Sequence, residues 1–344
     1  MKKVLVTGGS GYFGSLLIEK LKEKGFDCAI FDINDTEDRT NDVTFFQGDI
    51  RDYESISEAT KGMDIVFHNV AQVPLAKDRE LFESVNGLGT ENVLRASLES
   101  GVQKLVYTSS SAIFGVPKEN PVTEYTQPTP GEEYGQAKYE GELKCHEYVK
   151  KGLDVSIIRP RTIMGHGRLG IFQILFEWVR EGRNIPVFDG GNNVYQFIHA
   201  DDLAEVCILS GMKKGPAIYN CGTDRFGTMR EVLEALVVHA NTGSKVRSVP
   251  MGPVVLGMKV TSAIGLSPLG AYHALMYGKS MYFDTTKVET EFSWQAKYSN
   301  IEMFIDSYNW YVENREKVLT PDGNASHHRS AVKQGVLNVV KRFL

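Results

Sequence analysis

Several features that mark specialised proteins are missing from this sequence of 344 residues. It has only four cysteines, and they form no C-x-x-C pair. Each lies in an apolar run, which is typical of buried free thiols and not of disulfides or metal ligands. We therefore predict no metal site. The four are Cys28, Cys145, Cys207 and Cys221.

Long apolar runs and an excess of basic residues are also missing. Met1-Lys2-Lys3 leads directly into the short apolar run at residues 4–6, and no segment has the length and uniform apolarity of a signal peptide or membrane span. With a formal net charge of -5, the chain has no electrostatic signature of a nucleic-acid-binding protein. These absences predict a cytoplasmic protein without a nucleic-acid partner.

The first 160 residues alternate short apolar runs with longer segments of helical pattern. The expected strands are residues 4–6, 28–31, 44–46, 65–67, 104–108 and 155–159. Continuous apolar strands separated by helices are typical of a parallel sheet that is covered on both faces. The pattern predicts a doubly wound α/β domain over residues 1–160.

After Pro160 the rhythm changes to glycine-rich turns, a predicted helix over residues 172–182 and a short strand near 186–188. No repeat or low-complexity linker separates the two parts. We expect residues 161–315 to form mainly a smaller α/β substrate-binding region, with some segments returning to the first domain. Residues 316–344 are expected to form a C-terminal tail.

A glycine-rich run, Thr7-Gly8-Gly9-Ser10-Gly11-Tyr12-Phe13-Gly14, follows the first predicted strand and leads into a helical pattern over residues 15–24. Such a turn exposes backbone N–H groups at a helix start, where they can hold a pyrophosphate. Asp32 ends the second predicted strand, where a carboxylate can accept hydrogen bonds from the adenosine ribose and would repel a 2′-phosphate. The pattern favours NAD over NADP, although Arg39 could in principle serve a phosphate.

Tyr134 and Lys138 are four residues apart, so both lie on one face of a predicted helix. A free tyrosine with a pKa of about 10 is a poor base at neutral pH, but a neighbouring ammonium and a nicotinamide cation both favour the phenolate. A hydroxyl of Ser109-Ser110-Ser111, after the fifth predicted strand, could hold the reacting oxygen in line. Together these residues predict removal of hydride from a secondary alcohol.

The two signatures resemble those of the extended short-chain dehydrogenase/reductase family, which includes nucleotide-sugar epimerases and 3β-hydroxysteroid dehydrogenases. The resemblance covers roughly residues 1–315 and implies a Rossmann-type fold with Ser110 orienting the substrate oxygen, Tyr134 as the base and Lys138 holding the nicotinamide ribose. Further matching pieces are Gly48-Asp49-Ile50-Arg51-Asp52, His68-Asn69-Val70-Ala71, Val85-Asn86-Gly87-Leu88-Gly89-Thr90, Arg159-Pro160-Arg161 and Phe197-Ile198-His199-Ala200-Asp201-Asp202-Leu203-Ala204. The implied NAD-binding residues are Gly8, Gly11, Tyr12, Phe13, Gly14, Asp32, Asp49, Ile50, Asn69, Ala71, Asn86, Tyr134, Lys138 and Pro160.

Differences from the motifs of the family's subgroups reduce the number of candidate reactions. Sugar dehydratases carry Thr-Asp-Glu where this chain has Ser110-Ser111-Ala112, which disfavours dehydration. Neither Cys145 nor His166 lies in the acid–base motif of the epimerase-reductases. A 4-epimerase and a simple alcohol dehydrogenase remain, and both begin with the same oxidation.

Residues 185–197 resemble the substrate strand of the sugar-modifying members, in which an arginine usually grips the diphosphate. Tyr195 and Gln196 occupy that neighbourhood here, so the clamp is missing or moved. The candidate substrate residues are Ser111, Arg161 and Tyr195. Arg161, Arg168, Arg225 and Arg247 are the candidate replacements for the clamp.

Residues 249–277 point to another substrate, because this apolar segment rich in Met, Gly and Pro resembles 3β-hydroxysteroid dehydrogenases and suits a lid over an apolar ligand. Residues 332–344 form a basic amphipathic pattern that could rest on a membrane surface or pack on protein. The resemblance further implies a homodimer formed through helices near residues 81–100 and 134–150.

We therefore expect an NAD-dependent oxidoreductase that acts on a nucleotide sugar in the manner of a 4-epimerase. One alternative is oxidation or reduction of a hydrophobic alcohol or ketone, as in 3β-hydroxysteroid dehydrogenases. Another is a non-catalytic dinucleotide-sensing protein, which the presence of Ser110, Tyr134 and Lys138 together argues against.

Overall fold

The computed structural model describes residues 1–36, 39–71, 83–168, 172–252 and 278–319. Three expectations fall wholly or partly outside these residues: the apolar segment from residue 253 to 277, the basic pattern at 332–344, and residues 81–82 of the first expected dimer helix. Within the described ranges, no helix has the length and apolarity needed to cross a membrane.

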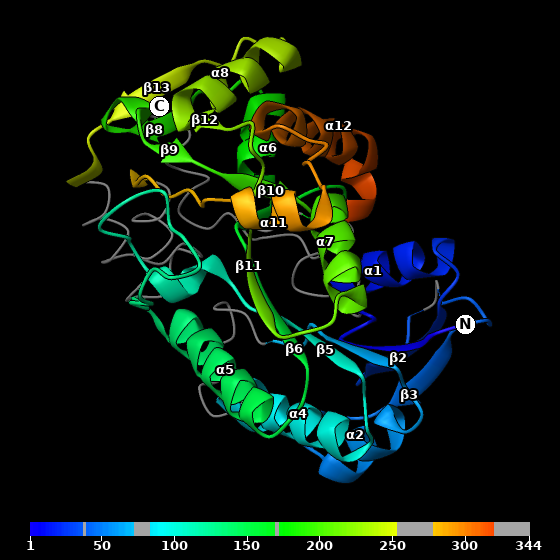
Figure 1. Ribbon diagram of the computed structural model, residues 1–344. Helices are drawn as coiled ribbons and strands as arrows, with labels where there is room; N and C mark the ends of the chain where they lie inside the picture. The colour runs from blue at the N-terminus through cyan, green and yellow to red at the C-terminus, as the bar shows by residue number, and fades with distance from the viewer. Residues whose placement is uncertain (37–38, 72–82, 169–171, 253–277, 320–344) are drawn as a thin grey trace.

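A seven-stranded parallel sheet forms the centre of the larger part of the molecule (Figure 1). Its order is β11-β6-β5-β4-β1-β2-β3. The strands are β1 (Lys3–Thr7), β2 (Asp27–Asp32), β3 (Thr44–Gln47), β4 (Ile65–His68), β5 (Lys104–Thr108), β6 (Val155–Pro160) and β11 (Ala217–Cys221). The first six confirm the predicted strands to within one residue at each end, while β11 comes from the second half of the chain.

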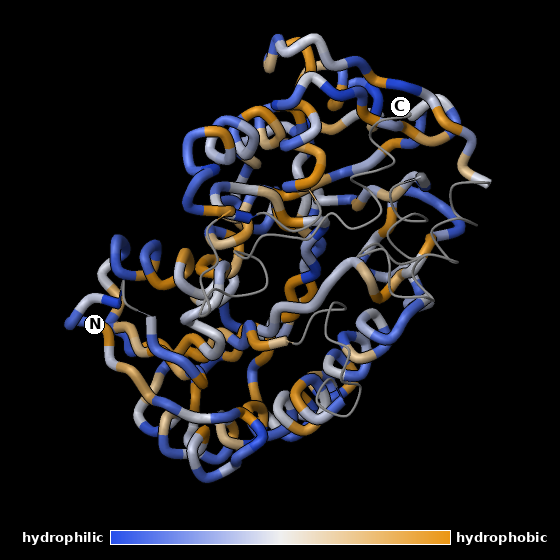
Figure 2. The backbone as a smooth tube through the Cα atoms, turned by 180° about the vertical axis from the view of Figure 1, so that it is seen from behind, coloured by the Kyte–Doolittle hydropathy of each residue, from blue (hydrophilic) through white to orange (hydrophobic). Residues whose placement is uncertain are grey.

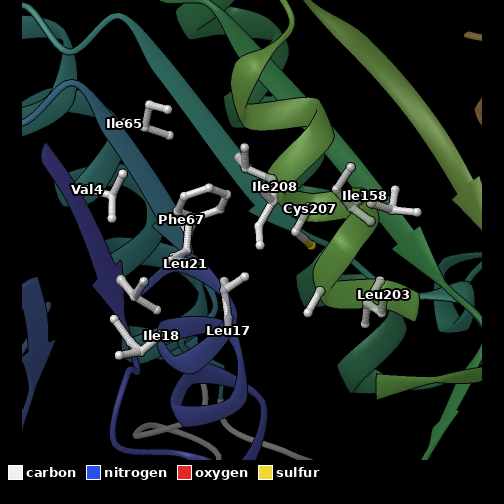
Figure 3. Close-up of a cluster of buried hydrophobic side chains, with 14 of the residues drawn as sticks. Val4, Leu17, Ile18, Leu21, Ile65, Phe67, Ile158, Leu203, Cys207 and Ile208 are labelled. Atoms are coloured by element: carbon white, nitrogen blue, oxygen red, sulfur yellow. The ribbon is translucent and has the colours of Figure 1, made fainter. Parts of the chain in front are cut away.

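Helices cover both faces of this sheet, which explains why its strands read as continuous apolar runs. On one face lie α1 (Tyr12–Glu23) and α7 (Ala200–Met212). Figure 3 shows Leu17 of α1 and Ile208 of α7 beside Phe67 of β4 in this buried cluster. The doubly wound α/β architecture is therefore confirmed.

The other face is covered by α2 (Tyr53–Thr60), α4 (Thr90–Glu99) and α5 (Glu133–Lys150). Successive residues of each strand face opposite sides, so Val4 belongs to the first cluster and Leu5 to the second. Along many helices the tube in Figure 2 alternates between blue and orange, as expected for helices with one buried face.

The smaller part of the molecule packs around a third apolar cluster. Phe304 lies at its centre, with ring centroids 5.0 Å from Phe197 and 6.4 Å from Phe176. Its helices are α6 (Phe172–Arg180), α8 (Met229–Ala240) and α12 (Asn300–Leu319). Its strand pairs are β7 (Thr162–Met164) with β10 (Phe197–His199), β8 (Ile185–Phe188) with β13 (Val246–Val249), and β9 (Val194–Tyr195) with β12 (Gly227–Thr228).

From β1, the strands β2 and β3 extend the sheet on one side, and β4, β5 and β6 extend it on the other. The order of the strands therefore reverses between β1 and β4. In open parallel sheets, ligands bind outside the carboxyl ends of the strands at such a switch point. The glycine-rich run follows β1, Asn69 follows β4, and the serine cluster follows β5. The topology therefore brings the predicted cofactor and proton-transfer residues to one edge of the sheet.

Candidate active site

The glycine-rich turn between β1 and α1 is closed by its own backbone. The Gly11 N–H donates to the Gly8 carbonyl over 3.1 Å, and Gly8 has a φ of +72°. A Cβ at Gly14 would lie 2.1 Å from the Gly8 carbonyl oxygen, so this close approach requires glycine. Helix α1 begins at Tyr12, three residues before the predicted start, which places the N–H groups of its first turn directly after the turn.

Asp32 lies at the end of β2 and faces this turn. Its carboxylate accepts hydrogen bonds from the backbone N–H groups of Ser10, over 3.1 Å, and Asn34, over 3.3 Å. Burial raises the pKa of Asp32, while these backbone hydrogen bonds act in the opposite direction. Arg39 is instead held by Asp35 through two hydrogen bonds of 2.8 and 2.9 Å. Asp32 is thus the ionisable group next to the turn, as a preference for NAD requires.

The predicted adenine-side residues follow β3. The Asp49 carboxylate is bound by the guanidinium of Arg51, which lowers the pKa of Asp49. Ile50 is buried, and its carbonyl accepts a hydrogen bond of 2.9 Å from Asn92 Nδ2. The Asp49 carboxylate therefore already has a cationic partner. The backbone at Ile50 is held in place by Asn92, which belongs to α4.

Asn69 and Ala71 follow β4, beside the glycine-rich turn. Thr108 Oγ1 donates to Asn69 Oδ1 over 2.5 Å, which leaves Asn69 Nδ2 buried without a hydrogen-bond partner in the described part of the chain. Ser10 Oγ is in the same condition. Buried polar atoms are normally paired, so two unpaired ones at the switch point fit residues that bind a polar cofactor.

The three predicted proton-transfer residues come together from β5 and α5. Ser110 acts to lower the pKa of Tyr134, and its Oγ accepts a hydrogen bond of 3.2 Å from the Ala112 N–H. Lys138 is buried, and its Nζ donates to the Thr108 carbonyl oxygen over 2.8 Å. Glu132 caps the first turn of α5 by accepting a hydrogen bond of 3.0 Å from the Gly135 N–H. The ends of β5 and α5 therefore fix the positions of all three side chains.

The electrostatics of this group differ from the sequence-based expectation. Burial raises the pKa of Tyr134, while Ser110 and the charge of Arg168 act to lower it. Burial also lowers the pKa of Lys138 to about 8. The sequence-based expectation concerned Lys138 together with a nicotinamide cation, and Arg168 is a further cation that acts to lower the pKa of Tyr134.

Arg168 is a residue whose place beside the tyrosine the sequence did not reveal. Its guanidinium carbon lies 5.6 Å from the ring centroid of Tyr12, at the start of α1. Arg168 follows the β7 strand in a glycine-rich turn, where a Cβ at Gly165 would lie only 2.9 Å from Tyr12 Oη. No local pattern connects residue 168 to residues 12 and 134, because only the fold brings them together.

The three candidate substrate residues also meet. Arg161 Nη1 donates to Ser111 Oγ over 2.9 Å, and its guanidinium carbon lies 4.5 Å from the centroid of the Tyr195 ring. The other candidate clamps lie elsewhere: Arg225 donates to the Lys297 carbonyl oxygen over 2.6 Å, and Arg247 is exposed on β13. Among the four candidates, Arg161 and Arg168 are thus the two near the serine cluster and Tyr134.

A buried ion pair supports this end of the sheet. Arg159 Nε and Nη2 donate to the two carboxylate oxygens of Glu142, over 2.9 and 2.7 Å. Ser109 Oγ donates to the same carboxylate over 2.6 Å. The sequence did contain a signal for this pair, because an arginine inside a fully buried strand requires a buried acceptor. The pair ties the strand β6 and the serine cluster to α5.

The four cysteines are buried free thiols, as predicted. In the described residues, no group of three or more His, Cys, Asp or Glu side chains is placed to hold a metal ion.

Comparison with known proteins places the chain in a family. Residues 4–222 match the NAD dependent epimerase/dehydratase family. The chain belongs to that family. It is an NAD-dependent enzyme of the epimerase/dehydrogenase type, and the glycine-rich turn, Asp32 and the unpaired Asn69 amide fit its NAD cofactor.

Relatives within the family differ in what their names describe. The uncharacterized protein y4nG of Sinorhizobium fredii is 52% identical over 338 residues, which are 98% of this chain and 85% of that one. UDP-glucose 4-epimerase 4 of Oryza sativa is 28% identical over 96% of this chain and 95% of its own. Human sterol-4-alpha-carboxylate 3-dehydrogenase, decarboxylating, is 33% identical over 61% of this chain and 57% of its own.

Solved structures share this fold over most of the chain. UDP-glucose 4-epimerase of Thermus thermophilus, in complex with NAD, superposes with a TM-score of 0.72 over 90% of this chain and 99% of its own, at 26% identity. The family therefore explains the seven-stranded sheet and its switch point, while the substrate has to be argued from this chain's own residues.

Proposed function

We propose that this family member removes hydride from a secondary alcohol of a nucleotide sugar, in the manner of a 4-epimerase. The observation that carries the proposal is the placement of Ser110, Tyr134 and Lys138 at the edge of the sheet where the NAD-binding turn lies. The match to a UDP-glucose 4-epimerase over 96% of the chain supports the choice of substrate class.

In the proposed reaction, Ser110, Tyr134 and Lys138 have different roles. NAD supplies the acceptor for the hydride that leaves the carbinol carbon. Tyr134 Oη takes the proton of the same hydroxyl group, and Ser110 Oγ holds the reacting oxygen by a hydrogen bond. Lys138 is fixed by the Thr108 carbonyl oxygen on the same face of α5, where its ammonium can bind the nicotinamide ribose. Because burial raises the Tyr134 pKa, the base works best when cationic charge lies beside it.

An oxidation or reduction of a hydrophobic alcohol is the second candidate. It is supported by the sterol-4-alpha-carboxylate 3-dehydrogenase, which is more identical in sequence than the rice epimerase but aligns over a shorter part of this chain. An epimerase keeps its NAD between turnovers, whereas a dehydrogenase exchanges it.

The first experiment therefore assays the cofactor. The protein is purified without added NAD and denatured, and the released dinucleotide is quantified; separately, NADH formation is followed with candidate alcohols. Near-stoichiometric NAD without net NADH formation supports the epimerase. An empty protein that accumulates NADH with an apolar alcohol supports the dehydrogenase.

The variant Tyr134→Phe tests the chemistry in either case. Loss of the proton acceptor lowers turnover by about 10²- to 10⁴-fold and leaves NAD affinity unchanged. Tyr139→Phe, on the same helix, is the matched control and keeps full turnover. Unchanged biological function in Tyr134→Phe would instead support a dinucleotide-sensing protein.

We also propose a homodimer formed through α4 and α5. These helices are joined by an ion pair between Glu91 and Lys144, and they expose Leu88, just before α4, and Leu143, on α5. The mass in solution, measured by light scattering, should be about twice the 38.3 kDa of one chain, and a mass near 38.3 kDa would refute the dimer.

A further inference from the structure

Arg161 is a buried cation without an acidic partner. The residue is 1% exposed, and no ion pair of Arg161 is found within the described residues. Only Nη1 is engaged, with Ser111 Oγ over 2.9 Å and Met281 Sδ over 3.1 Å. Nε and Nη2 have no hydrogen-bond partner in that part of the chain. Burying a charge is unfavourable unless it is paired and hydrogen-bonded, so the fold leaves this guanidinium uncompensated.

The two unpaired nitrogens share one edge of the guanidinium group. Nε–H and the neighbouring N–H of Nη2 point in parallel, which is the geometry that binds both oxygens of a carboxylate. Arg159, two residues earlier, uses this same edge to hold Glu142 through bonds of 2.9 and 2.7 Å. Arg161 therefore presents the same donor pair as Arg159 but lacks the carboxylate.

Two aromatic rings contact the guanidinium group but do not replace an anion. The guanidinium carbon lies 4.5 Å from the Tyr195 ring centroid and 5.6 Å from that of Phe283. Rings attract the cation through their faces, but they accept no in-plane N–H bonds. Their apolar surface excludes water, and a carboxylate bound there would be attracted more strongly than in water.

We propose that Arg161 binds a carboxylate of the substrate and selects alcohols that carry this group close to the reacting carbon. The proposal deepens the proposed function and rests on it. Ser111, which holds Arg161, is the neighbour of Ser110, and adjacent Cα atoms are about 3.8 Å apart. The hydrogen bond from Arg161 to Ser111 thus ties the guanidinium group to the segment that carries Ser110, and the substrate we propose is a hydroxy acid within the nucleotide-sugar class, such as a nucleotide-linked uronic acid.

A matched pair of ligands tests the selection. UDP-glucuronic acid and UDP-glucose have the same C4 alcohol and differ in a carboxylate or a hydroxymethyl group on the neighbouring carbon. By calorimetry with the NAD-loaded protein, we expect the acid to bind about 10- to 100-fold more tightly, as for hydrogen bonds to a charged group. Equal affinity for the two ligands would overturn the proposal for this class.

Two variants separate a substrate contact from a structural role. Arg161→Met should weaken binding of the acid far more than binding of UDP-glucose, so that the preference for the acid is lost. Arg225→Met removes a half-exposed arginine away from the serine cluster and should keep the preference. If Arg161→Met weakens both ligands equally, the arginine acts on the fold and the proposal fails.

Two further measurements distinguish a failure of the Arg161 proposal from a wrong choice of substrate class. A 3β-hydroxysteroid with and without a 4α-carboxylate is assayed by NADH formation, and Tm is measured in acetate against chloride at equal ionic strength. A carboxylate preference among the steroids alone, lost in Arg161→Met, would sustain Arg161 and refute the nucleotide sugar. Epimerisation of UDP-glucose without any carboxylate preference would support the nucleotide sugar as substrate and refute the role of Arg161. No preference in either pair and no acetate effect on Tm would overturn the Arg161 proposal altogether.

Discussion

Two buried arginines flank Pro160, and they differ in whether a carboxylate pairs with the guanidinium group. Arg159, in β6, gives its Nε and Nη2 hydrogens to Glu142, so that its charge is matched inside the sheet domain. Arg161, immediately after β6, has no carboxylate on the same two nitrogens in the described structure. The charge of Arg159 is compensated within the protein, whereas compensation of Arg161 requires the ligand anion that we propose.

Removing the paired arginine should have the largest effect. Arg159→Met leaves the Glu142 carboxylate buried with one serine hydroxyl, and the free energy of unfolding should fall by about 3 to 5 kcal/mol. Chemical denaturation followed by circular dichroism measures it. Glu147→Gln, on the exposed side of the same helix, is the control and should stay within about 0.5 kcal/mol of the wild type. A comparable loss in the control would show that α5 tolerates no change of charge.

Substitutions of the adjacent residues Ser110 and Ser111 should have the next largest effect, and they should separate proton transfer from substrate binding. Ser110→Ala removes a hydroxyl group that lowers the Tyr134 pKa, so the tyrosine deprotonates only at higher pH. The ascending limb of the pH–rate profile should move to higher pH, and kcat should fall by about 10²-fold. Ser111→Ala, which touches Arg161, should leave the limb in place. A shift of equal size in both variants would show that the serines act as one unit.

The stability of Arg161→Met should change little. Because this substitution removes an unpaired buried charge and keeps an apolar chain of similar length, we expect the free energy of unfolding to stay within about 1 kcal/mol of the wild type, or to rise. Denaturation of Arg161→Met beside Arg159→Met gives the comparison directly. Equal losses in the two variants would mean that contacts with Tyr195 and Phe283 make Arg161 a structural residue.

A further effect concerns a paired carboxylate in the smaller part of the molecule, and it is measured through the dependence of stability on acid pH. Burial of Glu177 opposes its ionisation, but hydrogen bonds from Arg315, Arg180 and Tyr311 outweigh burial and lower its pKa to about 2. The pairing thus stabilises the fold fully above the ordinary glutamate pKa of 4.5, and this contribution is lost as the pH falls toward 2. Unfolding measured across this range should depend less on pH in Glu177→Gln. An unchanged slope would mean that Glu177 does not control acid stability.

Local patterns were sufficient for much of the fold and of the cofactor site. The strands around Val4 and Phe67 could be predicted because they are buried on both faces and therefore apolar throughout. The glycine turn could be predicted because the close approach of Gly14 to Gly8 excludes side chains. The start of α1 was placed three residues late, since Tyr12 and Phe13 carry no helix-start signal of their own.

Contacts between distant segments could not be predicted in the same way. Arg168 reaches the Tyr134 region from a turn 34 positions further along the chain, and the sequence offered it only as one of four equivalent arginines. Burial raises the pKa of Tyr134, and this effect was not visible in the sequence. Burial depends on all the segments that surround a side chain, and a spacing of four residues does not contain that information.

By itself, the sequence determined the order of strands and helices, the glycine turn and the residue types available for proton transfer, because backbone geometry and alternating burial act over a few neighbouring residues. Only the tertiary structure decided that Glu142 neutralises Arg159 and that Arg161 is left without a carboxylate. Both arginines are part of one tripeptide, Arg159-Pro160-Arg161, and no local pattern in the sequence identifies Glu142 as the partner of one of them. Their roles diverge because compensation of a buried charge depends on which distant groups the fold brings within hydrogen-bonding distance.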